Sequence, residues 1–416
     1  MAKSPVRSIT LPQGFLAAGG TCGIKASGKP DLALIVSRVP CAAAAVTTRS
    51  KTPGTPLKVV RKHLRSGRAQ VMLCNSGCAN AATGDEGLAN AVRSCELVAE
   101  HLVRAGVVDM LHPERVLPAS TGVIGPQLPM AKIEAGIEDL AGRLATGPQA
   151  DADAARAIMT TDLAPKHASR TLRIGGKPVA LGGIAKGSGM IAPNMATMLV
   201  FLTTDAAVAP AALRGALREA CAASFNRMSV DGHTSPSDMV VLLANGQAGN
   251  AEVQPGGAGE AEFREALLSL CADLAYQIVK DGEGATRVMR VNIEGARSVR
   301  DADRAGQAVV NSPLVKAAVH GGDPNWGRIV TAAGHSGARM DPDAMSLHIG
   351  PKRDVGVFLR GQPARLNDRQ RAKLKACMTT PEVVFWLNLG AGEASVQWLG
   401  CDLSKEYVTI NAEYTT

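Results

Sequence analysis

Short apolar runs alternate with amphipathic helical patterns along most of this 416-residue chain. Leu32–Val39 and Ala69–Cys74 are strand candidates, whereas the residues from Asp85 to about Ala105 and Ala261–Lys280 have the patterns of helices. Such alternation indicates an α/β fold. The chain is too long for one ordinary core, so we expect two domains or one large α/β unit, with a structural boundary near residues 281–303.

Composition excludes several classes of protein. Hydrophobic residues make up 46% and charged residues 20%, which are values of a globular chain rather than a disordered one. The net charge is +8, but aromatic residues make up only 3% and the densest basic run, Lys58–Arg68, has the pattern of a solvated helix face. The N-terminus lacks the apolar segment of a signal peptide, and no apolar run approaches transmembrane length. We expect a cytoplasmic protein with neither nucleic-acid nor membrane partners.

The cysteines also favour a reducing compartment. There are nine, an odd number, and no Cys-x-x-Cys pair is present. The nearest approach, Cys74 and Cys78, has no second pair to complete a tetrahedral site. We therefore expect buried free thiols, no metal and no bound cofactor.

One junction in the sequence can carry nucleophilic chemistry. Lys186–Leu202 begins as a glycine-punctuated loop and ends in the apolar run Met198–Leu202, which predicts a loop followed by a buried strand. Thr197 stands between the two, after the small residue Ala196. If the chain cut itself there, the new α-amino group would supply a base for the threonine hydroxyl. From this pattern alone, a structural strand-edge threonine is the favoured interpretation.

Three other segments contain residue types that are found in catalytic or binding sites. Pro118–Gly125 is a loop of small and hydroxyl residues that can offer N–H groups and a hydroxyl to an oxyanion. Asp231–Asp238 gathers Asp, His and Ser, but a catalytic triad needs spatial convergence, so we interpret this loop as polar turn chemistry. Asp323–Arg328 has the pattern of a Pro-Asn turn with a buried Trp326, to which we assign a structural role.

Lys186–Leu199 reads KGSGMIAPNMATML and resembles the self-cleavage signature of the ornithine acetyltransferase (ArgJ) family, the glutamate N-acetyltransferases of arginine biosynthesis. Other segments similar to this family follow in order along essentially the whole chain: Gly14–Gly19, Asn75–Gly77, Ala79–Asn80, Thr83–Gly84, Met159–Asp162, Ser224–Arg227, Val230–Gly232, Lys280–Thr286, Asn311–Lys316 and Asp323–Arg328.

The resemblance implies both a fold and a processing step. The fold would be a layered α-β-β-α sandwich of the kind found in N-terminal-nucleophile hydrolases, with a smaller C-terminal α/β domain. The precursor would cleave itself between Ala196 and Thr197. The resulting α chain (residues 1–196) and β chain (residues 197–416) would stay together, as an α2β2 heterotetramer.

The resemblance also implies the reaction and its residues. Thr197 would be the nucleophile, taking the acetyl group from N2-acetyl-L-ornithine and passing it to L-glutamate by a ping-pong mechanism. Thr121 and Gly122 match the oxyanion hole of the family. The positions that match its substrate contacts are Thr160, Lys186, Thr197, Glu283, Asn411 and Thr416.

The sequence departs from the family pattern at Cys78, at His233 and at His320-Gly321, which leaves the substrate preference less defined than the reaction class. Two alternatives stay open. One is a related self-processing aminopeptidase or amidase, because fold alone does not choose the acyl acceptor. The other is a non-catalytic paralogue. Use of acetyl-CoA as a co-substrate is also open, since no nucleotide-binding motif marks it.

Overall fold

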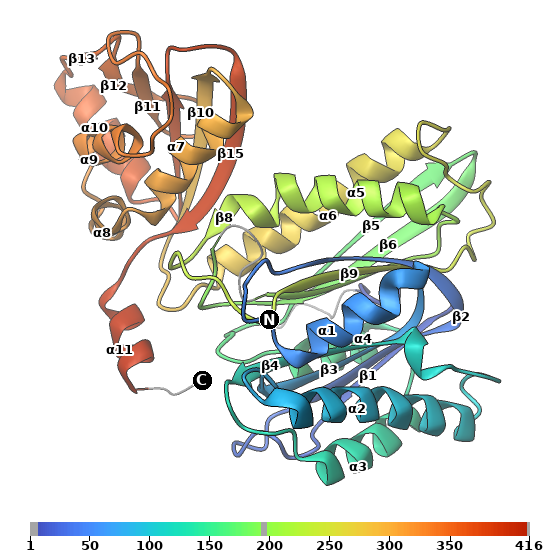
Figure 1. Cartoon of the computed structure of the whole chain (residues 1–416). Coiled ribbons are helices and arrows are strands. Elements are labelled where there is room, and N and C mark those ends of the chain that lie inside the picture. Colours follow the sequence, from blue (N-terminus) through green and yellow to red (C-terminus); the bar gives the residue numbers. More distant parts are fainter. Residues whose placement is uncertain (1–6, 193–197, 414–416) are drawn as a thin grey trace.

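The structure is a computed structural model that describes residues 7–192 and 198–413 (Figure 1). The predicted cut site at Ala196 and Thr197 and the predicted contact position Thr416 lie outside these residues.

The larger of two sheets is built mostly from the first 244 residues, in the order β4-β3-β2-β9-β7-β6-β5, with β1 paired to β2. Its strands are β1 (Phe15–Gly20), β2 (Leu32–Thr47), β3 (Arg68–Cys78), β4 (Val116–Val123), β5 (Lys166–Ile174), β6 (Lys177–Lys186), β7 (Leu199–Thr204) and β9 (Met239–Ala244).

The long strand β2 bends this sheet into two layers. Its first part, Leu32–Val36, pairs with β3, whereas its last part, Ala42–Thr47, pairs with β9. The register is irregular between Val36 and Cys41, around Pro40. A strand that changes layers at such an irregularity makes a corner, so one half of the sheet folds over the other.

Helices cover both outer faces of this folded sheet (Figure 1). Helices α5 (Pro210–Ala223) and α6 (Glu260–Lys280) lie on one side, and α2 (Gly84–Arg104) and α3 (Met130–Ala141) lie on the other. Two further helices, α1 (Thr55–His63) and α4 (Pro148–Ala157), contribute to the core between the sheet layers. The order is therefore α-β-β-α, which confirms the predicted fold class.

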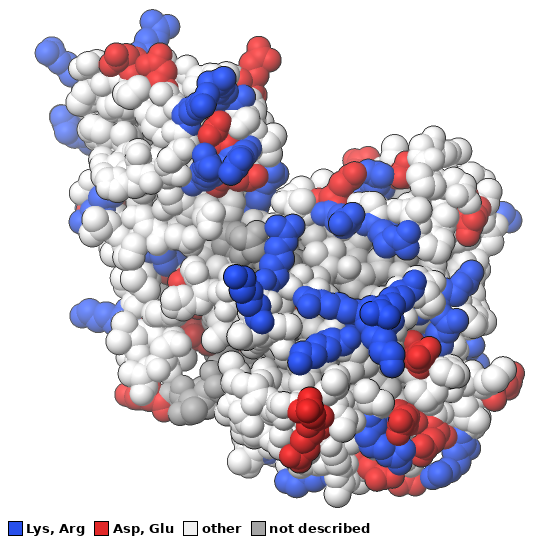
Figure 2. Space-filling model, viewed as in Figure 1, with Lys and Arg blue, Asp and Glu red and all other residues white. Residues whose placement is uncertain are grey.

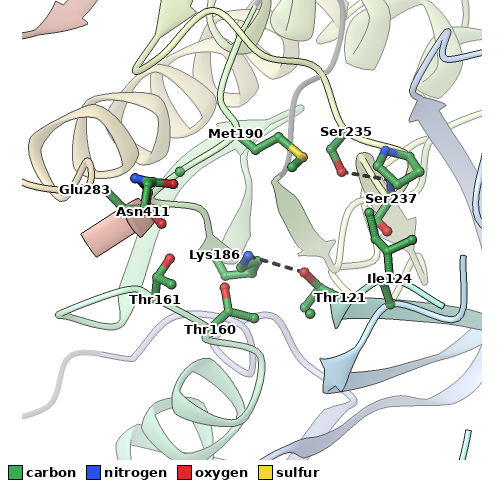
Figure 3. A pocket seen from close by; sticks show the side chains of 14 residues that line it. Thr121, Ile124, Thr160, Thr161, Lys186, Met190, Ser235, Ser237, Glu283 and Asn411 are labelled. Carbon is green, nitrogen blue, oxygen red and sulfur yellow. Dashed lines mark hydrogen bonds between the residues drawn. The ribbon is translucent and has the colours of Figure 1, made fainter. Parts of the chain in front are cut away.

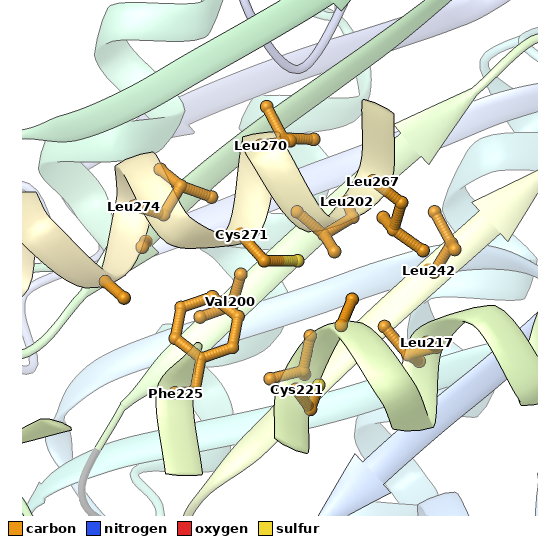
Figure 4. Packing of buried hydrophobic residues seen from close by; sticks show 14 of the residues in the cluster. Val200, Leu202, Leu217, Cys221, Phe225, Leu242, Leu267, Leu270, Cys271 and Leu274 are labelled. Atoms are coloured by element: carbon orange, nitrogen blue, oxygen red, sulfur yellow. The ribbon is translucent and has the colours of Figure 1, made fainter. Parts of the chain in front are cut away.

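Successive side chains along a strand point to opposite faces of the sheet and therefore contribute to different hydrophobic cores. On β7, Leu199 and Phe201 face the core between the two sheet layers, whereas Val200 and Leu202 pack against α5 and α6 (Figure 4). Both faces are covered, which explains why β7 and β9 are buried at every position and why β9 is apolar throughout.

A second sheet, in the order β13-β12-β11-β14-β10-β15-β8, belongs mainly to the C-terminal part of the chain. Its strands are β8 (Met228–Ser229), β10 (Val288–Ala296), β11 (Ser346–Ile349), β12 (Val355–Leu359), β13 (Gln362–Pro363), β14 (Glu382–Asn388) and β15 (Ala394–Cys401). The accompanying helices are α7 (Val299–Asn311), α8 (Pro313–Gly321), α9 (Trp326–Gly334) and α10 (Asp368–Met378). The described residues also form the short 3-10 helices η1 (Leu64–Ser66), η2 (Pro113–Arg115) and η3 (Phe225–Arg227).

The two parts of the chain are joined through a strand pair. β8 precedes α6 in the sequence, yet it pairs in parallel with β15 of the second sheet. The predicted boundary near residues 281–303 stays a prediction, because this pairing carries the second sheet across it. The last helix, α11 (Lys405–Glu413), leaves β15 and returns toward the larger unit (Figure 1).

Several expectations about single elements can be checked directly. The predicted helices at 85–105 and 261–280 correspond to α2 and α6, and all nine cysteines are free thiols, of which only Cys22 is not buried. The basic run Lys58–Arg68 is exposed at its charged positions, and Figure 2 shows Lys and Arg gathered over the face that carries α1. The prediction of a buried Trp326 is wrong: it is only half-buried, opens α9 and stacks on Phe358 at a centroid distance of 5.2 Å.

Candidate active site

A pocket opens where seven segments of the chain meet (Figure 3). It has a volume of about 590 Å³, counted with its open mouth. Its lining combines the segment after β3, the ends of β4 and β6, the turn after α4, the loop before β9, the turn after α6, and α11. The lining residues are Ala79, Thr121, Gly122, Ile124, Thr160, Thr161, Lys186, Gly189, Met190, Ser235, Pro236, Ser237, Glu283 and Asn411.

The predicted oxyanion-hole residues lie together near the end of β4. Parallel pairing with β3 sets Thr121 opposite Ser76 and Gly122 opposite Gly77. Gly122 has a φ of +126°, and a Cβ there would lie 2.4 Å from the carbonyl carbon of Gly77. Only glycine fits at this place, which keeps the two backbones in close contact beside the pocket.

Lys186 ends β6 with its ammonium group inside the protein. The residue is 2% exposed, and its Nζ donates a hydrogen bond to the Thr121 hydroxyl at 3.3 Å (Figure 3). Burial lowers the pKa of Lys186, and the negative charge of Asp162 opposes that change. A lysine held in this way presents a proton-bearing cation next to a hydroxyl, which suits a carboxylate or a developing oxyanion.

A buried ion network supports this wall of the pocket. Lys166 Nζ lies 2.6 Å from Asp162 Oδ1 and 2.5 Å from Asp281 Oδ2. Burial alone would raise the pKa of Asp162, but the charges of Lys186 and Lys166 outweigh it and hold that pKa at about 2. Asp162 is therefore ionised at neutral pH.

The same Asp162 carboxylate aligns two pieces of backbone. Its Oδ2 accepts a hydrogen bond from the Thr160 N–H at 2.9 Å, and its Oδ1 accepts one from the Gly187 N–H at 2.7 Å. Thr160 and Thr161 thereby face the pocket next to Lys186 (Figure 3).

An acidic group stands on another wall. Glu283 follows α6, and its N–H donates to the carbonyl of Ser188 at 3.1 Å. Asn411, on α11, donates from Nδ2 to Glu283 Oε2 at 2.9 Å. A Cβ at Gly189 would lie 2.3 Å from this carboxyl group, so the glycine makes room for it. The pocket thus presents a cation and an anion on separate walls, which fits a small molecule that carries both charges.

The remaining wall contains residues that the sequence analysis missed. Ser235, Pro236 and Ser237 line the pocket, together with Ile124 and Met190 (Figure 3). The interpretation of Asp231–Asp238 as a polar turn accounts only for its local bonds.

The turn at Asp231 also reaches the loop after β6. Its carboxylate accepts the N–H of His233 at 3.1 Å, as expected of a turn, but also those of Met190 and Ile191 at 2.6 and 2.9 Å. The one signal of a functional role in the sequence was the hydroxyl and acidic residues of this loop. The spacing of residues along the chain could not show that the loop lies beside residue 190.

The structure brings six of the predicted residues to one pocket: Thr121, Gly122, Thr160, Lys186, Glu283 and Asn411. Their catalytic and substrate-binding roles stay predictions. Thr197 is outside the described residues. The next residue, Met198, is buried, and Leu199 pairs with Lys186 across β6 and β7.

Two features are absent from residues 7–192 and 198–413. No group of His, Cys, Asp and Glu side chains there is arranged to hold a metal ion. No described helix combines the length and apolar character needed to cross a membrane.

Comparison with known proteins identifies the family. The model of the ArgJ family matches residues 16–416. The chain belongs to the ArgJ family. It is 47% identical to the arginine biosynthesis bifunctional protein ArgJ of Symbiobacterium thermophilum, over 98% of each chain.

Two solved structures are also similar to this ArgJ-family chain. The ArgJ crystal structure from Bacillus halodurans is 38% identical, covering 51% of this chain and 98% of that one with a TM-score of 0.49. The ornithine acetyltransferase of Mycobacterium tuberculosis, solved with ornithine, is 37% identical, covering 45% of this chain and 95% of that one with a TM-score of 0.41.

Proposed function

We propose that this chain is an acetyltransferase of arginine biosynthesis that moves the acetyl group of N2-acetyl-L-ornithine to L-glutamate. The observation that carries the proposal is the pocket of an ArgJ-family chain in which Lys186 and Thr121 occupy one wall and Glu283 another. A carboxylate suits the ammonium group of acetylornithine, and a lysine suits a carboxylate or an oxyanion.

The proposal includes self-cleavage between Ala196 and Thr197. The strands that flank this bond support continued association of the two products. β6, in the first product, pairs antiparallel with β7, in the second, from Leu181–Thr204 to Lys186–Leu199. β7 is also paired with β9 on its other edge. A cut after residue 196 therefore leaves both chains in one sheet. The expected assembly is an α2β2 heterotetramer, and native mass spectrometry measures its mass.

The chemistry follows from a free N-terminal threonine. The Thr197 hydroxyl attacks the acetyl carbonyl of acetylornithine while the Thr197 α-amino group takes the hydroxyl proton. The Thr121 hydroxyl and the Gly122 N–H stabilise the oxyanion. Its collapse breaks the amide bond, the proton passes to the leaving nitrogen, and ornithine departs. The amine of glutamate then attacks the acetyl ester, and the ester C–O bond breaks. The amine proton passes through the α-amino group to the Thr197 oxygen, so that N-acetylglutamate leaves and Thr197 is restored. An α-amino group has an ordinary pKa near 7.7–8.0, so an appreciable fraction is available as a base at neutral pH.

Intact-mass analysis of the wild type and of Thr197→Ala tests the processing step. We expect two fragments that meet at Ala196 and Thr197 in the wild type, and one uncut chain in the variant. An uncut wild type with full activity would overturn the mechanism.

An acetyl-transfer assay tests the reaction. Acetylornithine and glutamate should give N-acetylglutamate and ornithine in equal amounts with little acetate. Dominant acetate release would instead assign a hydrolase of the aminopeptidase or amidase type. The Symbiobacterium relative is named bifunctional, and the same assay with acetyl-CoA as sole donor tests for a second activity here.

A further inference from the structure

A second cleft lies where the C-terminal sheet meets the outer helices of the larger unit (Figure 1). Its volume is about 750 Å³, counted with its open mouth. One wall comes from α5, η3 and α6, and the other comes from β10, β14 and β15. Among the described residues, none lines both this cleft and the active pocket. A cleft of this size between two parts of a chain is a common place for a small-molecule site.

The sheet wall of the cleft is polar because successive residues of its strands face opposite sides. Met289, Val383 and Trp398 belong to the C-terminal hydrophobic core. A residue next to each of them points to the other face, which puts three polar side chains on the wall of the cleft: Arg290, Glu382 and Gln397.

Arg290 is held in a fixed position on this wall. Its Nε donates a hydrogen bond to Glu382 Oε1 at 2.6 Å, and its Nη1 donates to Gln397 Oε1 at 2.5 Å. From the opposite wall, the ring centroid of Tyr276 on α6 lies 5.8 Å from the guanidinium carbon. The third nitrogen of the guanidinium group, Nη2, makes no hydrogen bond within residues 7–192 and 198–413.

The helix wall carries a second arginine that is held in a similar way. Arg227, in η3, donates from Nε and Nη2 to the two carboxylate oxygens of Asp303 on α7, at 2.8 and 3.3 Å. Its Nη1 makes no hydrogen bond to the part of the chain that the structure describes. Arg227 ends the segment Ser224–Arg227, which was noted for its similarity to the ArgJ family, and both ends of that segment line this cleft.

The carboxylates of the cleft are already paired with cations. Burial acts to raise the pKa of Glu382, but the hydrogen bond and the positive charge of Arg290 lower it below the ordinary value. Glu382 is therefore ionised at neutral pH. Asp273 on α6 lies 3.2 Å from Arg170 and accepts a hydrogen bond from the Gln277 amide at 3.1 Å. What the cleft offers to a ligand is therefore the N–H donors of two oriented guanidinium groups, which match a carboxylate or a phosphate.

We infer that the cleft binds a small anion, a carboxylate or a phosphate, between Arg227 Nη1 on the helix wall and Arg290 Nη2 on the sheet wall. Each guanidinium group is oriented by its own carboxylate partner, so the anion meets donors that are already in place. The bound anion links the larger unit to the C-terminal sheet. The inference goes beyond the proposed function, because this cleft and the acetyl-transfer pocket have separate linings.

Isothermal titration of the full-length protein tests the inference, with succinate as the carboxylate probe and inorganic phosphate as the phosphate probe. We expect at least one of them to bind. Binding of succinate alone identifies a carboxylate site, and binding of phosphate alone identifies a phosphate site. If neither binds at about 10 mM, the inference is wrong.

Two variants show whether the anion binds in the cleft. Arg227→Gln and Arg290→Gln each remove the guanidinium group from one wall, and each should raise the Kd of the anion about 10-fold, because a hydrogen bond to a charged group is lost. Arg93→Gln makes the same change of charge at an exposed position of α2 and should keep the wild-type Kd. A wild-type Kd in both cleft variants would place the anion elsewhere, the active pocket included, and would overturn the inference.

A further variant separates binding from folding, because Arg290→Gln also leaves Glu382 without its cation. Arg290→Lys keeps a positive charge beside Glu382 but lacks the planar fork of a guanidinium group, and it should also bind the anion about 10-fold more weakly. The anion should raise the unfolding temperature of the wild type, and at the same concentration it should raise that of Arg290→Lys much less. An equal rise in the two proteins would contradict the inference.

Discussion

At the scale of single residues, buried charge dominates the site. Lys166, Lys186 and Asp162 are each about 2–8% exposed, and with Asp281 they tie the turn after α4, the end of β6 and the end of α6 together. Removing one member of such a network leaves a buried charge uncompensated, at a cost of about 3–5 kcal/mol. An exposed pair such as Arg93–Glu96 contributes little, because water and salt screen both charges.

The pKa of Asp162 predicts an acid limb in the stability of the protein. Its value of about 2 is below the ordinary 3.8, so the native state favours the ionised form. The corresponding stabilisation is present above about pH 4 and is lost as the pH falls toward 2. It amounts to about 2 kcal/mol. Urea unfolding between pH 2 and 6 measures the free energy of unfolding. As the pH falls across this range, the wild type should lose about this much more of that free energy than Asp162→Asn does. Parallel curves for the two proteins would contradict the assignment.

At the scale of elements, β2 shows why sequence patterns predicted the layers only in part. The pattern indicated a strand at Leu32–Val39, but the strand continues to Thr47 through Pro40 and a run of alanines. Proline and small residues usually mark the end of a strand, so local pattern could not predict the continuation. It is stabilised by pairing with β9, some 200 residues later in the chain, which no local window contains.

The close approach of β3 and β4 predicts the effect of Gly122→Ala. A Cβ at 2.4 Å from Gly77, added to a φ of +126°, must push the strands apart and displace the Gly122 N–H. Loss of one oxyanion donor lowers kcat by about 100-fold. Gly125→Ala is the matched control, because its φ is +106° but its Cβ would meet nothing within 4 Å. The strained φ costs each variant about 1–3 kcal/mol in thermal unfolding. Gly122→Ala should lose more than this because of its clash with Gly77, and it alone should lose kcat. Equal kcat losses would contradict the argument.

At the scale of the whole molecule, the pocket is an assembly that composition and spacing could not reveal. Thr121, Lys186, Glu283 and Asn411 come from four elements spread over most of the chain. Resemblance to the family singled them out one by one, and folding of the sheet places them together. The pocket residues 235–237 belong to the Asp231–Asp238 segment noted in the sequence. Their position at the pocket, however, depends on the pairing of β9 between β2 and β7.

The position of α11 predicts that stability and activity can be separated. From Lys405 to Glu413 none of its residues is buried, so its removal exposes little apolar surface. It nevertheless carries Asn411 to the Glu283 carboxylate. A chain ending at Ser404 should unfold at nearly the wild-type temperature while acetyl transfer is largely lost.

Two point variants of the full-length chain isolate the cause of that loss. Asn411→Ala removes the amide that lies beside Glu283 in the pocket, where Asn411 is a predicted substrate contact. Loss of one hydrogen bond to the substrate would lower kcat/KM by about 10-fold. Val408→Ala, at a 64% exposed position of the same helix, should leave kcat/KM unchanged. A large drop in the unfolding temperature of the truncated chain would show instead that α11 stabilises the fold. Equal kcat/KM values for the two point variants would show that the Asn411 amide does not act on the pocket.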